Sequence, residues 1–326
     1  MMPGIGIELP QRPPPDTPSG RRGRVLLAGL AAAAFLAFVV GASAGAGDGG
    51  TPDEAAPAEA APPTELPGGG REVFDDRRVV ALYGSPGDDA LGALGIGTPT
   101  QAGRELAKQA KAYETDEVPV MPAMELISTI AANSEGERGD YNIRIPAKTI
   151  DTYLAAARAM DAILILDVQP GYAEFMAEVR RLEPWLREPD VSLALDPEWH
   201  VRPPDIPGSV IGSVEAEQVN EVSAYLSRLV EAGDLPEKLL VVHQFTPDMI
   251  ADKETLEEHP GVAIVLNADG FSDPANKEAK YDELRPRGAA REFHPGFKLF
   301  YSEDYPLMTP KQVEALKPPP EFIVYE

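Results

Sequence analysis

From Arg71 onward, short apolar runs rich in β-branched residues alternate with amphipathic stretches of helical period. This alternation is typical of β/α units that build a parallel sheet. The apolar runs are almost continuous, as expected of strands that are buried on both faces. The predicted strands are Val79–Tyr83, Val118–Met121, Ala162–Asp167, Val191–Asp196, Lys238–His243, Val262–Asn267, Phe297–Tyr301 and Phe322–Tyr325.

The stretches between these strands predict seven helices. Proline in a first helical turn, and Gly233 after the longest stretch, are normal helix punctuation. The predicted helices are Gln101–Tyr113, Ala147–Met160, Tyr172–Leu186, Glu215–Ala232, Asp248–Glu258, Asn276–Leu284 and Pro310–Leu316. No helical stretch follows the eighth strand, so its outer face lacks a covering helix. We expect residues 71–78, or part of the segment before them, to cover it.

Eight strands over about 250 residues match the size of a single (β/α)₈ barrel. The predicted fold class is therefore α/β, a TIM barrel of eight parallel strands without its final helix. The alternative fold is an open doubly wound sheet. The first predicted strand-to-helix turn, Gly84–Asp88, lacks the G-x-G-x-x-G phosphate loop that would favour this alternative.

The N-terminal part of the chain is predicted to deliver and tether the barrel. Residues 1–24 are Pro-rich and predict a disordered cytoplasmic tail. Residues 25–46 form an uncharged run of about 22 residues, enough for a transmembrane helix, and arginines precede it. The alternative is a signal peptide cleaved near Ala42-Ser43-Ala44, which would give a secreted protein. Residues 47–70 predict an Ala/Pro/Gly-rich linker, and residues 71–326 the barrel domain.

This organisation predicts a single-pass membrane protein of a bacterial cell, with the barrel on the extracytoplasmic side. The chain carries a formal net charge of −24 and no cysteine. Such acidity argues against binding nucleic acid, because phosphate binding needs clustered Lys and Arg. The absence of cysteine excludes disulfides, thiolate metal ligands and cysteine nucleophiles.

Polar side chains follow most of the predicted strands at their C-terminal ends, where (β/α)₈ barrels carry their chemistry. Asp196 and Glu198 share one face of their strand with the small Ala194, whereas the neighbouring leucines share the other face. We therefore expect the small and acidic set to face the barrel axis. Strand-end carboxylates can also cap the following helix, but capping is a poor explanation for six strand ends at once.

The candidate ligand-binding residues share this position at or just after a strand end. Two of them are aromatic and offer flat apolar faces to a ligand. The candidates are Glu125, Asp167, Trp199, His200, His243, Asn267, Asp269 and Tyr301.

An acidic residue after the fourth strand and another after the seventh resemble the retaining glycosidases of the large clan that shares this layout. The resemblance covers residues 71–326 and is architectural. It implies that Glu198 is the acid/base and Glu303 the nucleophile. Asp196 lies two residues before Glu198, and we expect it to assist catalysis by raising the pKa of Glu198 through like-charge repulsion. That clan has Asn immediately before its strand-four Glu, where this chain has Pro197. The chain also resembles uncharacterised exported or membrane-anchored barrel proteins of high-GC bacteria, which implies no activity.

The leading hypothesis is a membrane-tethered glycoside hydrolase that acts on a polysaccharide or cell-envelope glycan through paired carboxylates, with no metal and no cofactor. One alternative is a barrel that binds a glycan or a partner without turnover. The other is a hydrolase that depends on a divalent metal, and its ligands would be His200, His243, Asp167, Asp196 and Asp269. The sequence leaves open whether the barrel is an enzyme at all.

Two strand-to-helix connections, Leu126–Ile145 and Val201–Ser213, exceed the usual length of about 2–6 residues. We expect both to be loops that rim the binding pocket and carry specificity.

Overall fold

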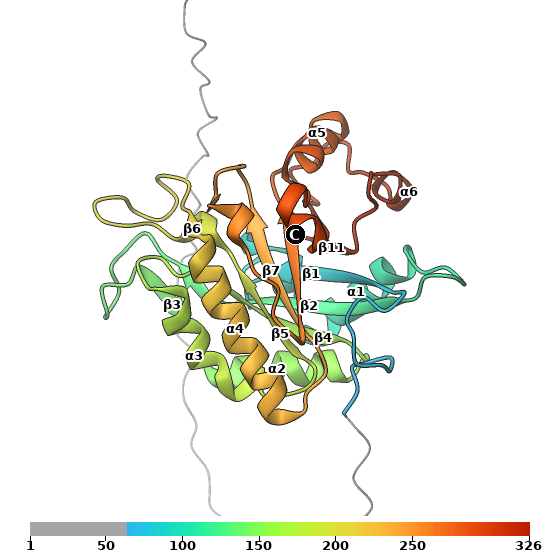
Figure 1. The fold of residues 1–326 in the computed structure, drawn as a ribbon, viewed down its shortest axis with the longest axis horizontal. Coiled ribbons are helices and arrows are strands. Elements are labelled where there is room, and N and C mark those ends of the chain that lie inside the picture. The colour runs from blue at the N-terminus through green and yellow to red at the C-terminus, as the bar shows by residue number, and fades with distance from the viewer. Residues whose placement is uncertain (1–63) are drawn as a thin grey trace, which may run out of the picture. The chain divides into compact units, whose positions relative to one another are not determined.

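The computed structural model describes residues 64–326, in which eight parallel strands close into a barrel (Figure 1). Hydrogen bonds between β1 and β2, and between β1 and β11, complete the ring. In order around it the strands are β1 (Arg78–Gly84), β2 (Val120–Ala131), β4 (Ile163–Val168), β5 (Val191–Leu195), β7 (Lys238–Gln244), β9 (Val262–Ala268), β10 (His294–Leu299) and β11 (Phe322–Tyr325). The predicted (β/α)₈ barrel is thus confirmed, and the open sheet is excluded.

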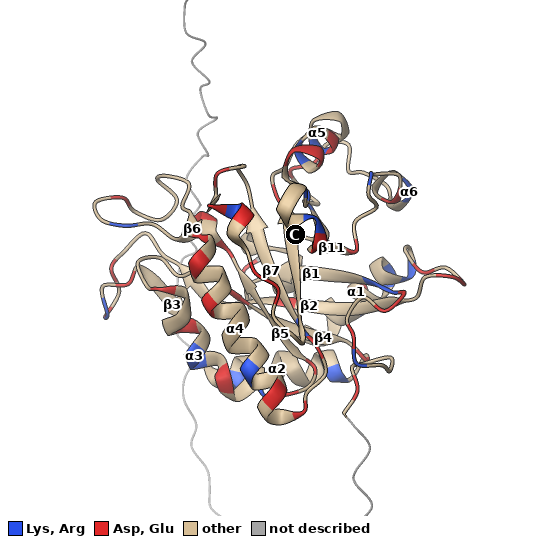
Figure 2. Cartoon of the chain, in the orientation of Figure 1, with Lys and Arg blue, Asp and Glu red and all other residues tan. Residues whose placement is uncertain are grey.

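Helices pack around the outside of the strands (Figure 1). They are α1 (Pro99–Lys111), α2 (Ala147–Arg158), α3 (Phe175–Leu186), α4 (Ala216–Gly233), α5 (Pro274–Leu284) and α6 (Pro310–Glu314), with short 3₁₀ turns η1 (Asp89–Leu91), η2 (Ala93–Gly95), η3 (Pro197–Trp199), η4 (Lys253–Thr255) and η5 (Gly288–Glu292). Acidic residues lie along α3, α4 and the loops, with Lys and Arg among them (Figure 2). The negative charge is therefore spread over the outer surface.

The predicted helix Asp248–Glu258 is wrong. This stretch contains β8 (Ile250–Ala251), which pairs with β6 (Val214–Glu215), followed by η4. Asp252, between β8 and η4, has a left-handed backbone with φ of 51°, a conformation that a right-handed α-helix excludes.

The twofold alternation of side chains divides the core into an outer and an inner cluster. Leu193 and Leu195 of β5 belong to the outer cluster, between strands and helices. Ala194 belongs to the inner cluster, along the barrel axis, together with Ile163 and Ile165 of β4. The predicted facing of β5 is therefore confirmed, and Asp167 and Asp196 continue the inward-facing positions of their strands.

The segment before β1 closes the N-terminal end of the barrel instead of covering its outer wall. Leu66, which the sequence pattern places in the linker, and Val73 are buried in the inner cluster. The backbone N–H of Val73 donates to the carboxylate of Glu237, just ahead of β7, at 2.7 Å. The guanidinium of Arg71 donates to the carbonyl oxygens of Thr64 and Leu235.

The outer face of β11 is covered from elsewhere. Val313 and Leu316, in and just after α6, join the outer cluster beside Tyr325 of β11. The hydroxyl of Tyr325 lies 2.6 Å from the hydroxyl of Tyr113, which follows α1. The expected covering role of residues 71–78 is therefore corrected, because their apolar side chains fit the open end of the barrel.

Of the two predicted loops, only one is a loop throughout. β2 continues beyond the barrel to Ala131 and turns back as β3 (Asn142–Arg144), which pairs with it antiparallel. Leu126–Ile145 is therefore mainly a β-hairpin, since the apolar and β-branched run of β2 does not stop at the barrel rim. Residues 201–213 form an irregular and mostly exposed loop between η3 and β6.

Within residues 64–326, no helix is both long and apolar enough to cross a bilayer. The predicted cytoplasmic tail (1–24), membrane span (25–46) and most of the linker (47–70) lie outside the described residues. The membrane anchor and the extracytoplasmic location therefore stay predictions.

The burial of Val73 predicts that the closing segment contributes to stability. Val73→Ala removes two buried methyl groups and should lower the free energy of unfolding by about 2 kcal/mol, measured by urea denaturation. Glu72→Ala, at the exposed neighbouring position, should change it by less than about 0.5 kcal/mol. Equal and negligible effects at both positions would show that this segment is not part of the barrel core.

Candidate active site at the C-terminal end of the barrel

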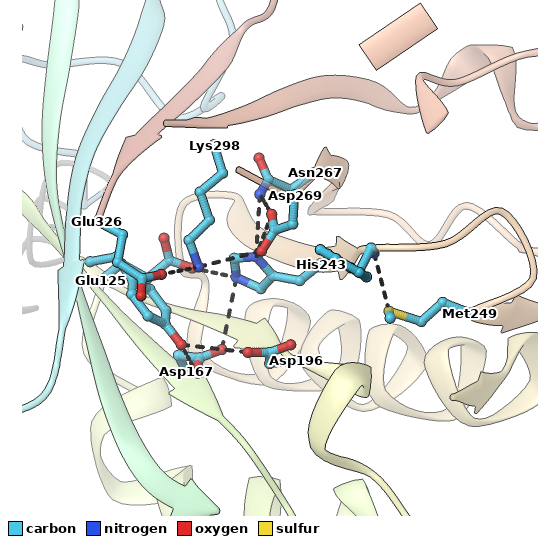
Figure 3. Close-up of polar contacts among 12 residues, drawn as sticks. Glu125, Asp167, Asp196, His243, Met249, Asn267, Asp269, Lys298 and Glu326 are labelled. Atoms are coloured by element: carbon cyan, nitrogen blue, oxygen red, sulfur yellow. Dashed lines mark hydrogen bonds and ion pairs between the residues drawn. The ribbon is translucent and has the colours of Figure 1, made fainter. Parts of the chain in front are cut away.

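Each barrel strand places a polar side chain at its C-terminal end, on the inward-facing positions (Figure 3). Below them the same positions are mostly apolar, for example Val79 and Ala81 in β1 and Leu239 and Val241 in β7. The polar residues that follow in this alternation, one for each strand in ring order, are Tyr83, Glu125, Asp167, Asp196, His243, Asn267, Lys298 and Glu326.

His243 lies at the centre of this layer and is 1% exposed. Its Nε2 is 2.9 Å from Oε1 of Glu125, and its Nδ1 is 3.2 Å from both carboxylate oxygens of Asp269. Burial by itself lowers the pKa of His243, but the carboxylates of Asp269 and Glu125 outweigh burial and hold the pKa well above its usual value. The raised pKa favours the imidazolium form, in which both ring nitrogens donate to these carboxylates.

The ammonium of Lys298 is the second buried cation of the layer. Its Nζ lies 3.3 Å from Oδ2 of Asp269 and 2.7 Å from Oε2 of Glu326. It also lies 3.7 Å from the centroid of the Tyr83 ring, within reach of a cation–π interaction. Burial opposes the charge, but Asp269 and Glu326 raise the pKa of Lys298 well above its usual value.

Asp269 is therefore an ionised carboxylate even though it is buried. Burial raises its pKa, but Lys298 and His243 outweigh burial and keep the pKa below the usual value. The amide of Asn267 also donates to Oδ1 of Asp269. This carboxylate is thus held by three donors in a fixed orientation.

Asp167 and Asp196 have the opposite tendency. Burial is the largest cause that raises the pKa of each carboxyl, and for Asp167 the charge of Asp196 adds to it. The hydroxyl of Tyr83 donates to Oδ2 of Asp167 at 3.2 Å, and the amide of Gln169 donates to that hydroxyl at 2.9 Å. These two carboxyls therefore keep a proton to a higher pH than the neighbouring Asp269 does.

A cavity of about 200 Å³ opens above this layer. Asp196, Asp269 and Lys298 line its floor, and its aromatic lining consists of Tyr83, Trp199, Phe245, Phe271 and Phe300. Glu198, half-buried in η3, also lines it. Burial first, and then the charges of Asp196 and Asp269, raise the pKa of Glu198 to about 7. The cavity thus joins a carboxyl that titrates near neutral pH with one that stays ionised.

Most of the candidate residues predicted from the sequence meet here. Glu198, Asp196, Trp199 and Asp269 line the cavity, and beneath it lie Glu125, Asp167, His243 and Asn267, all at most 1% exposed. Glu125 and Asp167 are thus placed in the layer that supports the floor, without lining the cavity.

Glu303 does not lie with them. β10 ends at Leu299, so the last inward-facing position of that strand belongs to Lys298, and Glu303 is exposed in the turn beyond and does not line the cavity. Its neighbour Asp304 is buried instead, where it accepts from the backbone N–H of Phe300 at 2.9 Å and anchors the turn.

His200 and Tyr301 also lie outside the cavity. His200 is buried, with Nδ1 2.8 Å from the carbonyl oxygen of Ser213, and so joins the two ends of the 201–213 loop. Burial lowers the pKa of His200, which favours a neutral imidazole that donates to this carbonyl. Tyr301 stacks on Tyr325 at 5.1 Å and donates from its hydroxyl to Gln109. In this structure neither side chain lines the cavity, and their part in ligand binding stays a prediction.

Lys298 and Glu326 are site residues that the sequence analysis missed. The alternation of inward- and outward-facing residues along β10 and β11 could have identified both. Gly296 and Lys298 occupy the inward-facing positions of β10, while Phe297 and Leu299 join the outer cluster, and Glu326 follows the inward-facing Phe322 and Val324. A lone lysine in an apolar strand was the clue, because such a charge needs buried partners.

Comparison with known proteins adds no assignment: no family model matches this chain, and neither does any curated protein. The fold and the site define a (β/α)₈ barrel with a cavity lined by ionisable side chains at the C-terminal ends of its strands.

The environment of Lys298 predicts a strong effect on stability. Lys298→Met strands the carboxylates of Asp269 and Glu326 and should cost about 3 kcal/mol of unfolding free energy, by urea denaturation. Adding Glu326→Gln should restore part of that loss, since one stranded charge is removed. Lys311→Met, at an exposed position of α6, is the control and should stay within about 0.5 kcal/mol. A Lys298→Met variant as stable as the control would contradict the buried ion cluster.

Proposed function

We propose that the barrel is a glycoside hydrolase that acts on a polysaccharide or cell-envelope glycan, with Glu198 as its general acid. One observation carries the proposal: a single cavity holds a carboxyl whose pKa is raised to about 7 and an Asp269 carboxylate whose pKa is lowered. Glycoside cleavage needs one carboxyl that delivers a proton to the leaving oxygen and one that faces the developing positive charge.

The two roles fall on residues with different surroundings. Glu198 is half-buried and lines the cavity, so its proton can reach a bound substrate. Asp269 stays anionic because Lys298 and His243 face it, and it is the candidate that stabilises or attacks the oxocarbenium-like carbon. In this assignment Asp269 takes the part that the architectural resemblance gives to Glu303, because Asp269 lines the cavity and Glu303 does not.

The shape and lining of the cavity suggest a small part of a glycan. Its volume of about 200 Å³ is below the ~300–1,000 Å³ of pockets for drug-sized ligands, so it suits one sugar ring at a chain end. Trp199 and Phe271 offer apolar faces for stacking, and Gln169 offers an amide for a hydroxyl. Phe271 is 59% exposed at the rim, where a second sugar unit would pass.

Replacing the general acid should separate substrates by their leaving groups. Glu198→Gln should lower kcat/KM on natural glycans by about 10²–10⁴-fold, measured by release of reducing sugar. The loss should be much smaller on aryl glycosides with an acidic phenol, because such a leaving group departs without a proton. Glu303→Gln is the matched control and should keep wild-type activity. Equal losses on both substrate classes, or activity lost only in Glu303→Gln, would refute the assignment.

The raised pKa of Glu198 predicts the pH dependence of the reaction. A general acid must be protonated, so kcat/KM should fall as the pH rises through about 7. The pKa of Asp269 is lowered, so the acidic limb of the pH–activity profile, where Asp269 becomes protonated, should lie below the usual range for Asp. Activity should therefore persist in mild acid. In Glu198→Gln the limb near neutral pH should disappear from the residual activity on aryl glycosides. A limb that persists unchanged in this variant would assign the proton to another group, and no cleavage of any glycan by the wild type would favour a barrel that only binds.

A further inference from the structure

Three buried side chains converge beneath the floor of the cavity. They are Glu125 of β2, Asp167 of β4 and His243 of β7, and each is at most 1% exposed. One ligand atom from each lies within 4.8 Å of the other two. Nε2 of His243 is 2.9 Å from Oε1 of Glu125 and 3.9 Å from Oδ1 of Asp167. Ligand atoms on one metal ion at bonds of about 2.1 Å lie roughly 3.0–3.4 Å apart, so the three need only a small inward shift.

Two atoms of this group have no hydrogen-bond partner. Oε2 of Glu125 and Oδ1 of Asp167 are both buried and unpaired among the described residues. A buried carboxylate oxygen without a donor costs free energy, and native proteins rarely leave one. The apolar layer below offers no donor, since Ile163 and Ile165 occupy the inward-facing positions beneath Asp167. A cation between the two carboxyls would satisfy both atoms.

The rest of each side chain is held in place by neighbours. Nδ1 of His243 faces Asp269, and Asp269 is fixed in turn by Asn267 and Lys298. The hydroxyl of Tyr83 donates to the other oxygen of Asp167. Histidines that ligate metals almost always donate their second ring nitrogen to a carboxylate or carbonyl, which fixes the ring and leaves the first nitrogen free. His243 has this arrangement, with Nε2 turned to the two carboxyls (Figure 3).

The charges around the group leave room for a cation. Among the described residues, the layer and the cavity above it contain six carboxyl side chains but only two basic ones, His243 and Lys298. The carboxyl side chains are those of Glu125, Asp167, Asp196, Glu198, Asp269 and Glu326. A divalent ion bound between Glu125, Asp167 and His243 would offset part of this excess of carboxyl groups. Asp269 contacts His243 and, like Asp196, also lines the cavity, so acidic side chains connect the group with the cavity.

We propose that Glu125, Asp167 and His243 form a binding site for one divalent transition-metal ion, Zn²⁺ or Mn²⁺. The ligand set of one imidazole nitrogen and two carboxylate oxygens, without sulfur, suits these ions. It suits Ca²⁺ less, because Ca²⁺ takes six to eight oxygen ligands. The site lies below Glu198, and the proposal does not rest on glycosidase activity. An ion there ties together the ends of three strands that are not all adjacent in the barrel.

The test uses the full chain in detergent, freed of metal with a chelator and then dialysed. Zn²⁺, Mn²⁺, Mg²⁺ and Ca²⁺ are added separately, and bound metal is counted by elemental analysis after gel filtration. We expect one equivalent of Zn²⁺ or Mn²⁺ per chain and a Tm that rises by about 5 °C at 100 times the Kd. Mg²⁺ and Ca²⁺ should give little shift. Failure of the wild type to retain either transition metal would overturn the proposal.

Variants distinguish this site from the acidic surface. Glu125→Gln and Asp167→Asn keep the shape of the side chains and should each abolish both the stoichiometric binding and the Tm shift. Glu303→Gln, at an exposed carboxylate of the same barrel end, should retain both. Glu198→Gln should also retain both, so a failure of this proposal is distinguishable from a failure of the glycosidase proposal. Binding that survives in both Glu125→Gln and Asp167→Asn would place the metal elsewhere. If either variant does not fold, anomalous scattering from crystals of the metal-loaded wild type decides where the ion lies.

Discussion

The alternation of side chains in a closed sheet is the constraint on which this structure depends. Because successive residues of a strand point to opposite faces, every second residue of all eight strands must be accommodated inside one narrow barrel. The lower inward-facing positions are small or apolar, as Ala81, Ala123 and Ala194 illustrate. At the C-terminal ends of the strands the same positions are polar. The same rule that fills the barrel therefore also gathers eight polar side chains into one layer.

A layer of this kind is stable only if its charges compensate one another out of contact with water. Lys298 and His243 supply the positive charge, and Asp269 lies between them with contacts to both. Asp167, which lies 3.9 Å from the imidazole of His243, and Asp196 are less closely paired with these cations, and burial raises their pKa values. Three aspartates of one layer thus differ in acidity, because Asp269 lies between the two cations whereas Asp167 and Asp196 do not. Such divergence of neighbouring carboxyls is a physical marker of functional sites.

The fold could be predicted from the sequence more completely than the residues of the site. Buried parallel strands are nearly continuous apolar runs, so all eight could be located from the sequence. The helix predicted at residues 248–258 is absent, because the left-handed backbone of Asp252 interrupts a stretch whose side-chain pattern is amphipathic. Strand-end carboxylates were found because they are conspicuous, whereas Lys298 was overlooked inside its strand. Glu303 was preferred because it follows the seventh strand in sequence. The structure shows that β10 ends at Leu299, so Glu303 lies too far beyond the strand for its side chain to face the barrel axis.

The closing segment at the base of the barrel also fixes a direction. Leu66 and Val73 hold the start of the described chain at the N-terminal ends of the strands, while the cavity opens at their C-terminal ends. The chain thus enters at one pole and the cavity lies at the other. A group joined directly to the start of the described chain would therefore lie at the pole opposite the cavity and would leave the cavity mouth free.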